Sequence, residues 1–234
     1  MIFRNRSDVT LEKINEKIEI KGIIFDFDFT LADSSKGVLE CINYALQEIG
    51  FKKFPAKEIN KTIGLTLEHT LINLVGEQHR DKAEKFKHFF IKKADEVMAD
   101  LTILFSETPA VIQFLFEKGI KLGIVSTKFR YRIEAILSRE NLLNFFEVII
   151  GGEDISTLKP NPYGLLLAAN KLNLQPSEVI YVGDSIIDAE TANRAGISFI
   201  AALSGVATRD TFSQLQVKDF INNISEIPSK LGIK

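Results

Sequence analysis

The stretch GIIFDFDFT, residues 22–30, decides the fold class and places the candidate site. Its apolar run predicts a buried β-strand, which we expect over Gly22–Phe27. Two carboxylates, Asp26 and Asp28, lie at its end, and burying acids so close together is unfavourable unless a positive charge is near. Along a continuing strand both would point to one side, where a divalent cation would remove their repulsion. A pair of loop-capping aspartates is the alternative.

Outward from this strand, short apolar runs alternate with amphipathic stretches. The further expected strands are Lys121–Ser126, Val148–Gly151, Val179–Gly183 and Ile197–Ala201. The expected helices are Pro109–Lys118, Arg130–Arg139, Pro162–Leu172 and Ser185–Ala195. This alternation predicts an α/β fold with a three-layer, Rossmann-like core, in which helices cover both faces of a parallel sheet.

The interval before Lys121 breaks this alternation, because it reads mostly as helix. Three apolar stripes at helical spacing begin near Val38, Leu67 and Phe86. We therefore predict an inserted all-helical domain. The expected division is an N-terminal extension over residues 1–20, an α/β core over residues 21–34 and 104–234, and a helical insert over residues 35–103.

Composition excludes several classes of protein. The 234 residues are 45% hydrophobic and 26% charged, which is typical of a globular chain and not of a disordered or fibrous one. A net charge of -2 argues against a nucleic-acid partner, which needs clustered Lys and Arg. The single cysteine, Cys41, excludes an internal disulfide and a Cys-based zinc site. We find neither a signal peptide nor about 18 consecutive apolar residues, and expect a cytoplasmic protein without a membrane partner.

Polar side chains suited to phosphate or metal follow three further expected strands. They are Ser126 and Thr127, then Lys159, then Asp184 and Asp188. In an open α/β sheet, ligands bind beyond the carboxyl ends of the strands. Hydroxyls and a lysine suit phosphate, and carboxylates suit Mg²⁺. Helix capping or an exposed loop would explain each signal alone, but their ordered occurrence at four strand ends favours one site.

These segments resemble the four ordered motifs of the haloacid dehalogenase superfamily. The segments are DFDFTLADS (residues 26–34), the strand end at Ser126, LKPNP (residues 158–162) and GDSIIDAETANRAG (residues 183–196). The position of the insert resembles that of the helical C1 cap of subfamily I, and the chain is most similar to its phosphoglycolate-phosphatase-like members. The resemblance implies a Mg²⁺-dependent phosphatase that hydrolyses a small phosphorylated metabolite, such as phosphoglycolate or a sugar phosphate.

The resemblance also implies roles for individual residues. Asp26 matches the nucleophile that forms an aspartyl-phosphate, and Asp28 matches the general acid and base. The other implied roles are phosphate binding by Ser126, Thr127 and Lys159, metal binding by Asp26, Asp28, Asp184 and Asp188, and substrate selection by a cap loop at Gly64, Leu65 and Thr66. The chain departs from the family at Phe29, where relatives often have Gly.

Several alternatives share these motifs. A phosphosugar mutase forms the same aspartyl-phosphate, and an inorganic pyrophosphatase or a nucleotidase has the same fold. A non-catalytic binding protein is the alternative from another class, and the complete set of acids with Lys159 argues against it. The three histidines lie in the insert, where we expect surface or packing roles; His69 is the exception, since it follows the cap loop and is a candidate for substrate contact. A monomer and a homodimer are both consistent with the sequence.

Overall fold

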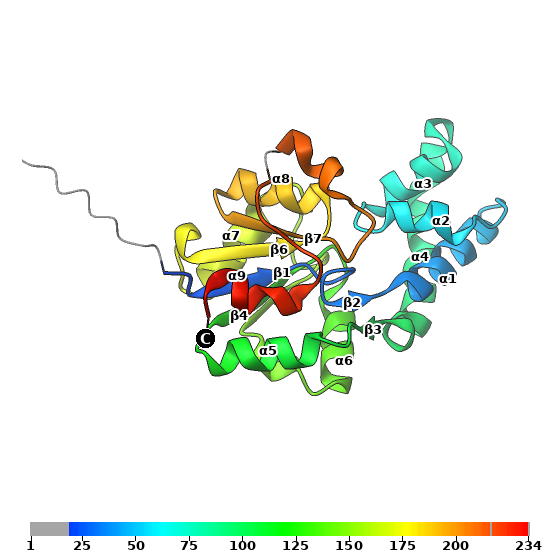
Figure 1. Ribbon diagram of the computed structural model, residues 1–234. Coiled ribbons are helices and arrows are strands. Elements are labelled where there is room, and N and C mark those ends of the chain that lie inside the picture. The colour runs from blue at the N-terminus through cyan, green and yellow to red at the C-terminus, as the bar shows by residue number, and fades with distance from the viewer. Residues whose placement is uncertain (1–18, 216, 234) are drawn as a thin grey trace, which may run out of the picture.

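A six-stranded parallel sheet forms the centre of the computed structural model, which describes residues 19–215 and 217–233 (Figure 1). Its strands are β1 (Gly22–Phe25), β4 (Lys121–Val125), β5 (Val148–Ile150), β6 (Val179–Gly183), β7 (Ser198–Ala202) and β8 (Phe220–Ile221). Their order across the sheet is β5-β4-β1-β6-β7-β8. The expected extension over residues 1–20 lies almost wholly outside the described residues. The central position of β1 places its carboxyl end beside the ends of β4 and β6.

Helices cover both faces of this sheet, which confirms the expected fold class. Helices α5 (Thr108–Glu117), α6 (Arg130–Arg139) and α9 (Ile227–Leu231) pack on one face, and α7 (Tyr163–Lys171) and α8 (Ile186–Ala195) pack on the other. Short 3-10 turns lie at Asn60–Thr62, Glu77–Lys82, Leu143–Phe145, Pro176–Glu178, Arg209–Leu215 and Ile224–Glu226.

Strand β1 is apolar throughout because it is buried on both faces. Ile23 and Phe25 belong to the core beneath α5 and α6, whereas Ile24 belongs to the core beneath α7. This is the alternation that a pleated strand requires. Each such side chain contributes about 1.5–3 kcal/mol of burial free energy, so the register of β1, and with it the position of the acids that follow, is strongly specified.

A helical insert, which we define as α1 to α4, lies beside the sheet (Figure 1). Its helices are α1 (Ser35–Glu48), α2 (Ala56–Ile59), α3 (Leu67–Val75) and α4 (Ala83–Leu101). They share a hydrophobic core of their own, to which Leu46, Leu71 and Phe86 contribute. The short antiparallel strands β2 (Ala32–Asp33) and β3 (Ile103–Leu104) pair where the chain enters and leaves the insert.

The chain turns earlier after β1 than the sequence suggests. The strand ends at Phe25 and not at Phe27, because the next residues form a tight turn in which the Phe29 amide donates to the Ala32 carbonyl at 2.7 Å. Phe29 lies in this turn with a φ of 59°, a left-handed conformation that disfavours a side chain by about 1–2 kcal/mol. This conformation gives a physical reason why glycine suits the position.

The boundaries of two elements match the expected ones. Strand β6 and helix α6 have the expected bounds. The sequence did not indicate β2, β3 or β8, because each has two residues and hydrophobic periodicity needs a longer window. Within the described ranges, no helix combines the length and the apolar character that a membrane-spanning segment needs.

Candidate active site

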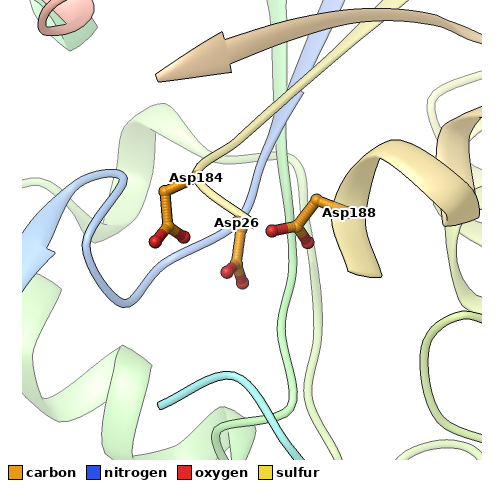
Figure 2. Close-up of side chains that lie close together, drawn as sticks. All are labelled: Asp26, Asp184 and Asp188. Atoms are coloured by element: carbon orange, nitrogen blue, oxygen red, sulfur yellow. The ribbon is translucent and has the colours of Figure 1, made fainter. Parts of the chain in front are cut away.

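Three carboxylates meet at the carboxyl ends of β1 and β6. Asp26 follows β1, Asp184 follows β6, and Asp188 lies in the first turn of α8. Figure 2 shows these side chains close together, and their oxygens lie within 4.8 Å of one another. All three residues are buried. We call Asp26, Asp184 and Asp188 the carboxylate cluster.

Lys159 brings a positive charge to the carboxylate cluster from the loop after β5. Its Nζ lies 3.0 Å from Asp26 Oδ1 and donates to Asp188 Oδ1 at 2.6 Å and to the Tyr181 hydroxyl at 3.1 Å. Burial lowers the pKa of Lys159, but the charges of Asp188 and Asp26 outweigh it and raise the pKa above its ordinary value. Lys159 is therefore a permanent cation whose contacts are all with core residues.

Asp188 has hydrogen bonds to both of its oxygens. Oδ1 accepts from Lys159 Nζ and from the Tyr181 hydroxyl, the latter at 2.8 Å. Oδ2 accepts from the backbone amide of Ser185 at 3.1 Å and from the Ser185 hydroxyl. Ser185 and Asp188 thereby form a capping box that begins α8. The helix-capping interpretation of this motif is thus correct, and the same contacts hold Asp188 against Lys159.

The negative charges of Asp26 and Asp184 are less well compensated by neighbouring groups than that of Asp188. Burial, followed by the charge of neighbouring carboxylates, raises the pKa of Asp26 to about 7, even though Lys159 lowers it. Burial and the charge of Asp188 also raise the pKa of Asp184 well above its usual range. Asp26 Oδ1 accepts no hydrogen bond from any described residue. Three buried carboxylates beside one lysine leave an excess of negative charge, and oxygen donors of this kind fit a hard divalent cation such as Mg²⁺.

Asp28 shares none of the hydrogen bonds of the carboxylate cluster. It forms an ion pair with a second lysine, Lys128. Lys128 Nζ is 3.1 Å from Asp28 Oδ1, and both side chains are mostly buried. The backbone of Lys128 is fixed, because its amide donates to Ser126 Oγ at 3.3 Å and its carbonyl accepts from the Gly152 amide at 3.1 Å. Lys128 is a residue that sequence reasoning missed, although it directly follows Ser126 and Thr127 at a strand end.

Tyr181 is a second residue that sequence reasoning missed. It lies within β6, where an apolar or aromatic residue is expected for packing alone. Burial raises the pKa of its hydroxyl well above the ordinary value, so the group stays protonated and donates to Asp188. No sequence signal distinguishes this tyrosine from a core residue, since its partner lies on a different element.

A cavity of about 490 Å³ separates the carboxyl edge of the sheet from the helical insert. Residues from the sheet side that line it are Asp28, Thr127, Lys128, Phe129 and Arg132. Residues from the insert include Gly64, Leu65, Thr66, His69 and the apolar Val38, Ile42 and Phe90. The structure thus brings the expected cap loop and Thr127 together with Asp28. Ser126, Lys159 and the carboxylate cluster do not line this cavity.

The cap loop has defined local geometry. Gly64 has a φ of 89°, a conformation that glycine adopts without strain. Thr66 is the N-cap of α3, and its hydroxyl accepts from the His69 amide at 3.3 Å. The Thr66 hydroxyl also contacts His69 Nδ1 at 2.9 Å, so His69 lies at the cavity with one ring nitrogen engaged.

Two arginines of α6, the buried Arg132 and the exposed Arg139, join the sheet side to the insert. Arg132 on α6 donates to Asp95 Oδ1 on α4 at 2.7 Å and to the Ile91 carbonyl at 3.3 Å. Arg139, also on α6, donates to the carbonyls of Ala99 and Thr102 at 2.6 and 2.8 Å. These contacts hold the carboxyl-terminal half of α4 against α6, beside the cavity.

Comparison with known proteins agrees with this geometry. Residues 23–202 match the family model of the haloacid dehalogenase-like hydrolases. The phosphoglycolate phosphatase of Aquifex aeolicus is 30% identical over 201 residues, which cover 86% of this chain and 91% of that protein. The phosphoglycolate phosphatase of Yersinia pseudotuberculosis is 29% identical over 194 residues, covering 80% and 82%.

A solved structure from Bacteroides fragilis, described as a haloacid dehalogenase-like hydrolase, is also similar. It shares 40% sequence identity and superposes with a TM-score of 0.85, covering 89% of this chain and all of that one. Sequence motifs, fold and relatives therefore agree. The chain belongs to the haloacid dehalogenase-like hydrolase family and is a phosphoric monoester hydrolase.

Proposed function

We propose that this protein is a Mg²⁺-dependent phosphatase that hydrolyses a small phosphorylated metabolite through an aspartyl-phosphate on Asp26. The observation that carries the proposal is the environment of Asp26. This carboxylate lies in a buried acidic cluster, and its Oδ1 forms an ion pair with Lys159 Nζ at 3.0 Å without an aligned hydrogen bond. A carboxylate held beside a fixed cation in this way is placed to attack phosphorus.

In the first half-reaction, an Asp26 oxygen attacks the phosphorus atom. The bond from Asp26 to phosphorus forms as the bond from phosphorus to the ester oxygen breaks. Asp28, at the edge of the cavity, donates a proton to the departing oxygen. Lys159, Ser126 and Thr127 hold the phosphoryl oxygens, and the charge of Lys159 offsets the negative charge that develops on them.

In the second half-reaction, water attacks the phosphorus of the aspartyl-phosphate. Asp28 accepts a proton from this water, the bond to Asp26 breaks, and inorganic phosphate leaves. Asp26 and Asp28 are then back in their starting forms. This use of one residue first as acid and then as base is the reason for a second carboxylate so near the first.

The residues that would hold Mg²⁺ are Asp26, Asp184, Asp188 and the backbone carbonyl of Asp28. When bound, the ion supplies positive charge that lets Asp26 and a phosphoryl dianion approach one another. The support for this assignment is the burial of the carboxylate cluster together with its excess negative charge, which raise the pKa of both Asp26 and Asp184.

Two observations support a small phosphorylated acid or sugar phosphate as the substrate. The curated relatives named above are phosphoglycolate phosphatases, and the cavity joins Asp28 to the cap loop at Gly64, Leu65 and Thr66. We also propose the division expected from the sequence, with a cap over residues 35–103 and a core over 21–34 and 104–234, because the insert has a separate hydrophobic core. A cytoplasmic location, the absence of a nucleic-acid partner, and a monomer or homodimer remain predictions.

A phosphate-release assay over a broad ester panel tests the proposal. The panel contains phosphoglycolate, p-nitrophenyl phosphate, sugar phosphates, nucleotides and pyrophosphate, each with Mg²⁺ and with EDTA. We expect Mg²⁺-dependent release from at least one monoester. Isomerised sugar phosphate without net release would instead identify a mutase. The absence of release from every compound would contradict the proposed function.

A further inference from the structure

Three cations are buried in the described part of the chain, namely Lys128, Arg132 and Lys159. Two of them have well-formed hydrogen bonds within the protein. Lys159 donates to Asp188 at 2.6 Å, and Arg132 donates to Asp95 at 2.7 Å. Lys128 differs, because its ammonium makes no hydrogen bond to a described residue and its neighbour is the proposed acid and base.

The contact between Lys128 and Asp28 is an ion pair without an aligned hydrogen bond. The two atoms are 3.1 Å apart, yet Asp28 Oδ1 has no hydrogen-bond partner among the described residues. The Lys128 side chain is only 4% exposed, and the residue lines the cavity between sheet and insert. A mostly buried lysine with unused donors is unfavourable, so an acceptor in the cavity would satisfy it.

We propose that Lys128 binds a carboxylate of the leaving group and thereby selects phosphorylated small hydroxy acids. The inference rests on the proposed function, since it assumes that Asp28 meets the ester oxygen. An ammonium forms shorter and stronger hydrogen bonds to a carboxylate than to a hydroxyl or an amide. Lys128 is therefore a substrate-binding residue that determines specificity, separate from Lys159 at the phosphoryl group.

The distance between the two groups limits where the carboxylate sits. A proton donor lies about 3 Å from the atom that it protonates, so the ester oxygen lies within about 6 Å of Lys128 Nζ, given the 3.1 Å contact to Asp28. A carboxylate on the carbon next to the ester oxygen has its own oxygens roughly 3 Å from that oxygen. It therefore spans the gap between the ester oxygen and Lys128.

Three other basic residues line the cavity, and all are less suited to this role. Arg132 already donates to Asp95 at 2.7 Å. Lys87 lies on α4 and is exposed, so water already satisfies its ammonium. His69 has one ring nitrogen engaged by the Thr66 hydroxyl. Lys87 and His69 belong to the insert, whereas Lys128 lies on the core side in direct contact with Asp28. Lys87 thus provides a matched control within the same cavity.

The experiment compares phosphoglycolate with its neutral carboxamide analogue, glycolamide phosphate. For the unmodified protein with Mg²⁺, we expect kcat/KM to favour the carboxylate by about 10-fold or more, as for a charge-assisted hydrogen bond. In Lys128→Met we expect the ratio to fall to within about 3-fold of one, with the loss for phosphoglycolate mainly in KM. In Lys87→Met we expect the ratio of kcat/KM for the two compounds to equal that of the unmodified protein.

Several results would overturn the inference while leaving the proposed function intact. These are turnover with no preference for the carboxylate, a preference that survives in Lys128→Met, or a preference lost in Lys87→Met. If Lys128→Met does not fold by circular dichroism, Lys128→Gln keeps a donor toward Asp28 without the charge, and the same expectation applies.

A binding measurement separates this inference from the proposed function. If no ester is turned over, the proposed function fails, and calorimetric binding of phosphoglycolate with and without Lys128→Met still tests the role of Lys128. Weaker binding of phosphoglycolate in the variant, by about 10-fold, supports the role. Equal binding in the two proteins contradicts it.

Discussion

Two buried lysines at the same edge of the sheet have opposite surroundings. Lys159 contacts Asp26, Asp188 and Tyr181, all of them core residues. Lys128 contacts Asp28 and the cavity. The proposed phosphoryl side of the site is therefore organised within the sheet, whereas the proposed leaving-group side is organised between the sheet and the insert. In the proposed mechanism the first serves the chemistry of phosphoryl transfer and the second the choice of substrate.

The largest expected effect concerns Asp26, the acid beside Lys159. Asp26→Asn should lower kcat by at least about 10³-fold, because the nucleophile is lost. The protein should keep its fold, since burial already raises the pKa of Asp26 and a neutral isostere removes that unfavourable charge. Phosphate release and thermal denaturation measure the two effects. The exposed Asp100→Asn is the matched control, and activity retained in Asp26→Asn would refute the nucleophile.

The second prediction compares the two lysines directly. Lys159→Met should lower the free energy of unfolding by about 3–5 kcal/mol, because it leaves Asp26 and Asp188 buried beside one another without a cation. Lys128→Met should lower it less, since Asp28 is more exposed and has a single ion pair. Urea denaturation of both variants measures the difference. Equal losses, or a larger loss for Lys128→Met, would remove the distinction between the two sides of the site.

The third prediction concerns pH and the metal-free protein. The pKa of Asp26 is raised from 3.8 to about 7 on folding, so between these values the folded state binds more protons than the unfolded state. Its contribution to stability is therefore fully present below about pH 4 and is lost as the pH rises through about 7. With EDTA present, the melting temperature of the unmodified protein should fall across this range relative to that of Asp26→Asn. Parallel curves for the two proteins would contradict the raised pKa.

Tyr181 gives the smallest expected effect. Tyr181→Phe removes the hydroxyl that donates to Asp188 at 2.8 Å, and a hydrogen bond to a charged group contributes about 1.5–3 kcal/mol. We expect a stability loss in that range and a modest loss of kcat through a less well-held Lys159. The exposed Tyr163→Phe should change neither quantity. If Tyr181→Phe changes neither stability nor kcat, the hydrogen bond from Tyr181 is not needed to hold Asp188 in place.

The sheet and the phosphoryl side of the site were predictable from sequence because local patterns encode them. The apolar run before Asp26 forms a strand that is buried on both faces, and parallel strands bring their carboxyl ends to one edge. Asp26, Lys159, Asp184 and Asp188 therefore meet as the ordered motifs indicate. Their roles in catalysis stay predictions until the variants above are measured.

The leaving-group side could not be predicted in the same way. The burial of Lys128 depends on where the insert packs, and its contact with Asp28 joins two strand ends about a hundred residues apart along the chain. Tyr181 is identical in pattern to a core aromatic until its partner Asp188 is placed. The turn at Phe29 ended β1 early because of a local left-handed residue, which apolar periodicity does not report.

The most direct test of the account is the detection of a covalent intermediate on Asp26. The protein is mixed with Mg²⁺ and a substrate that it turns over, quenched in acid during turnover, digested and analysed by mass spectrometry. We expect a phosphoryl adduct on the peptide that contains Asp26, and no adduct in Asp26→Asn. Sustained phosphate release with an adduct on another residue, or with none at any quench time, would contradict the account.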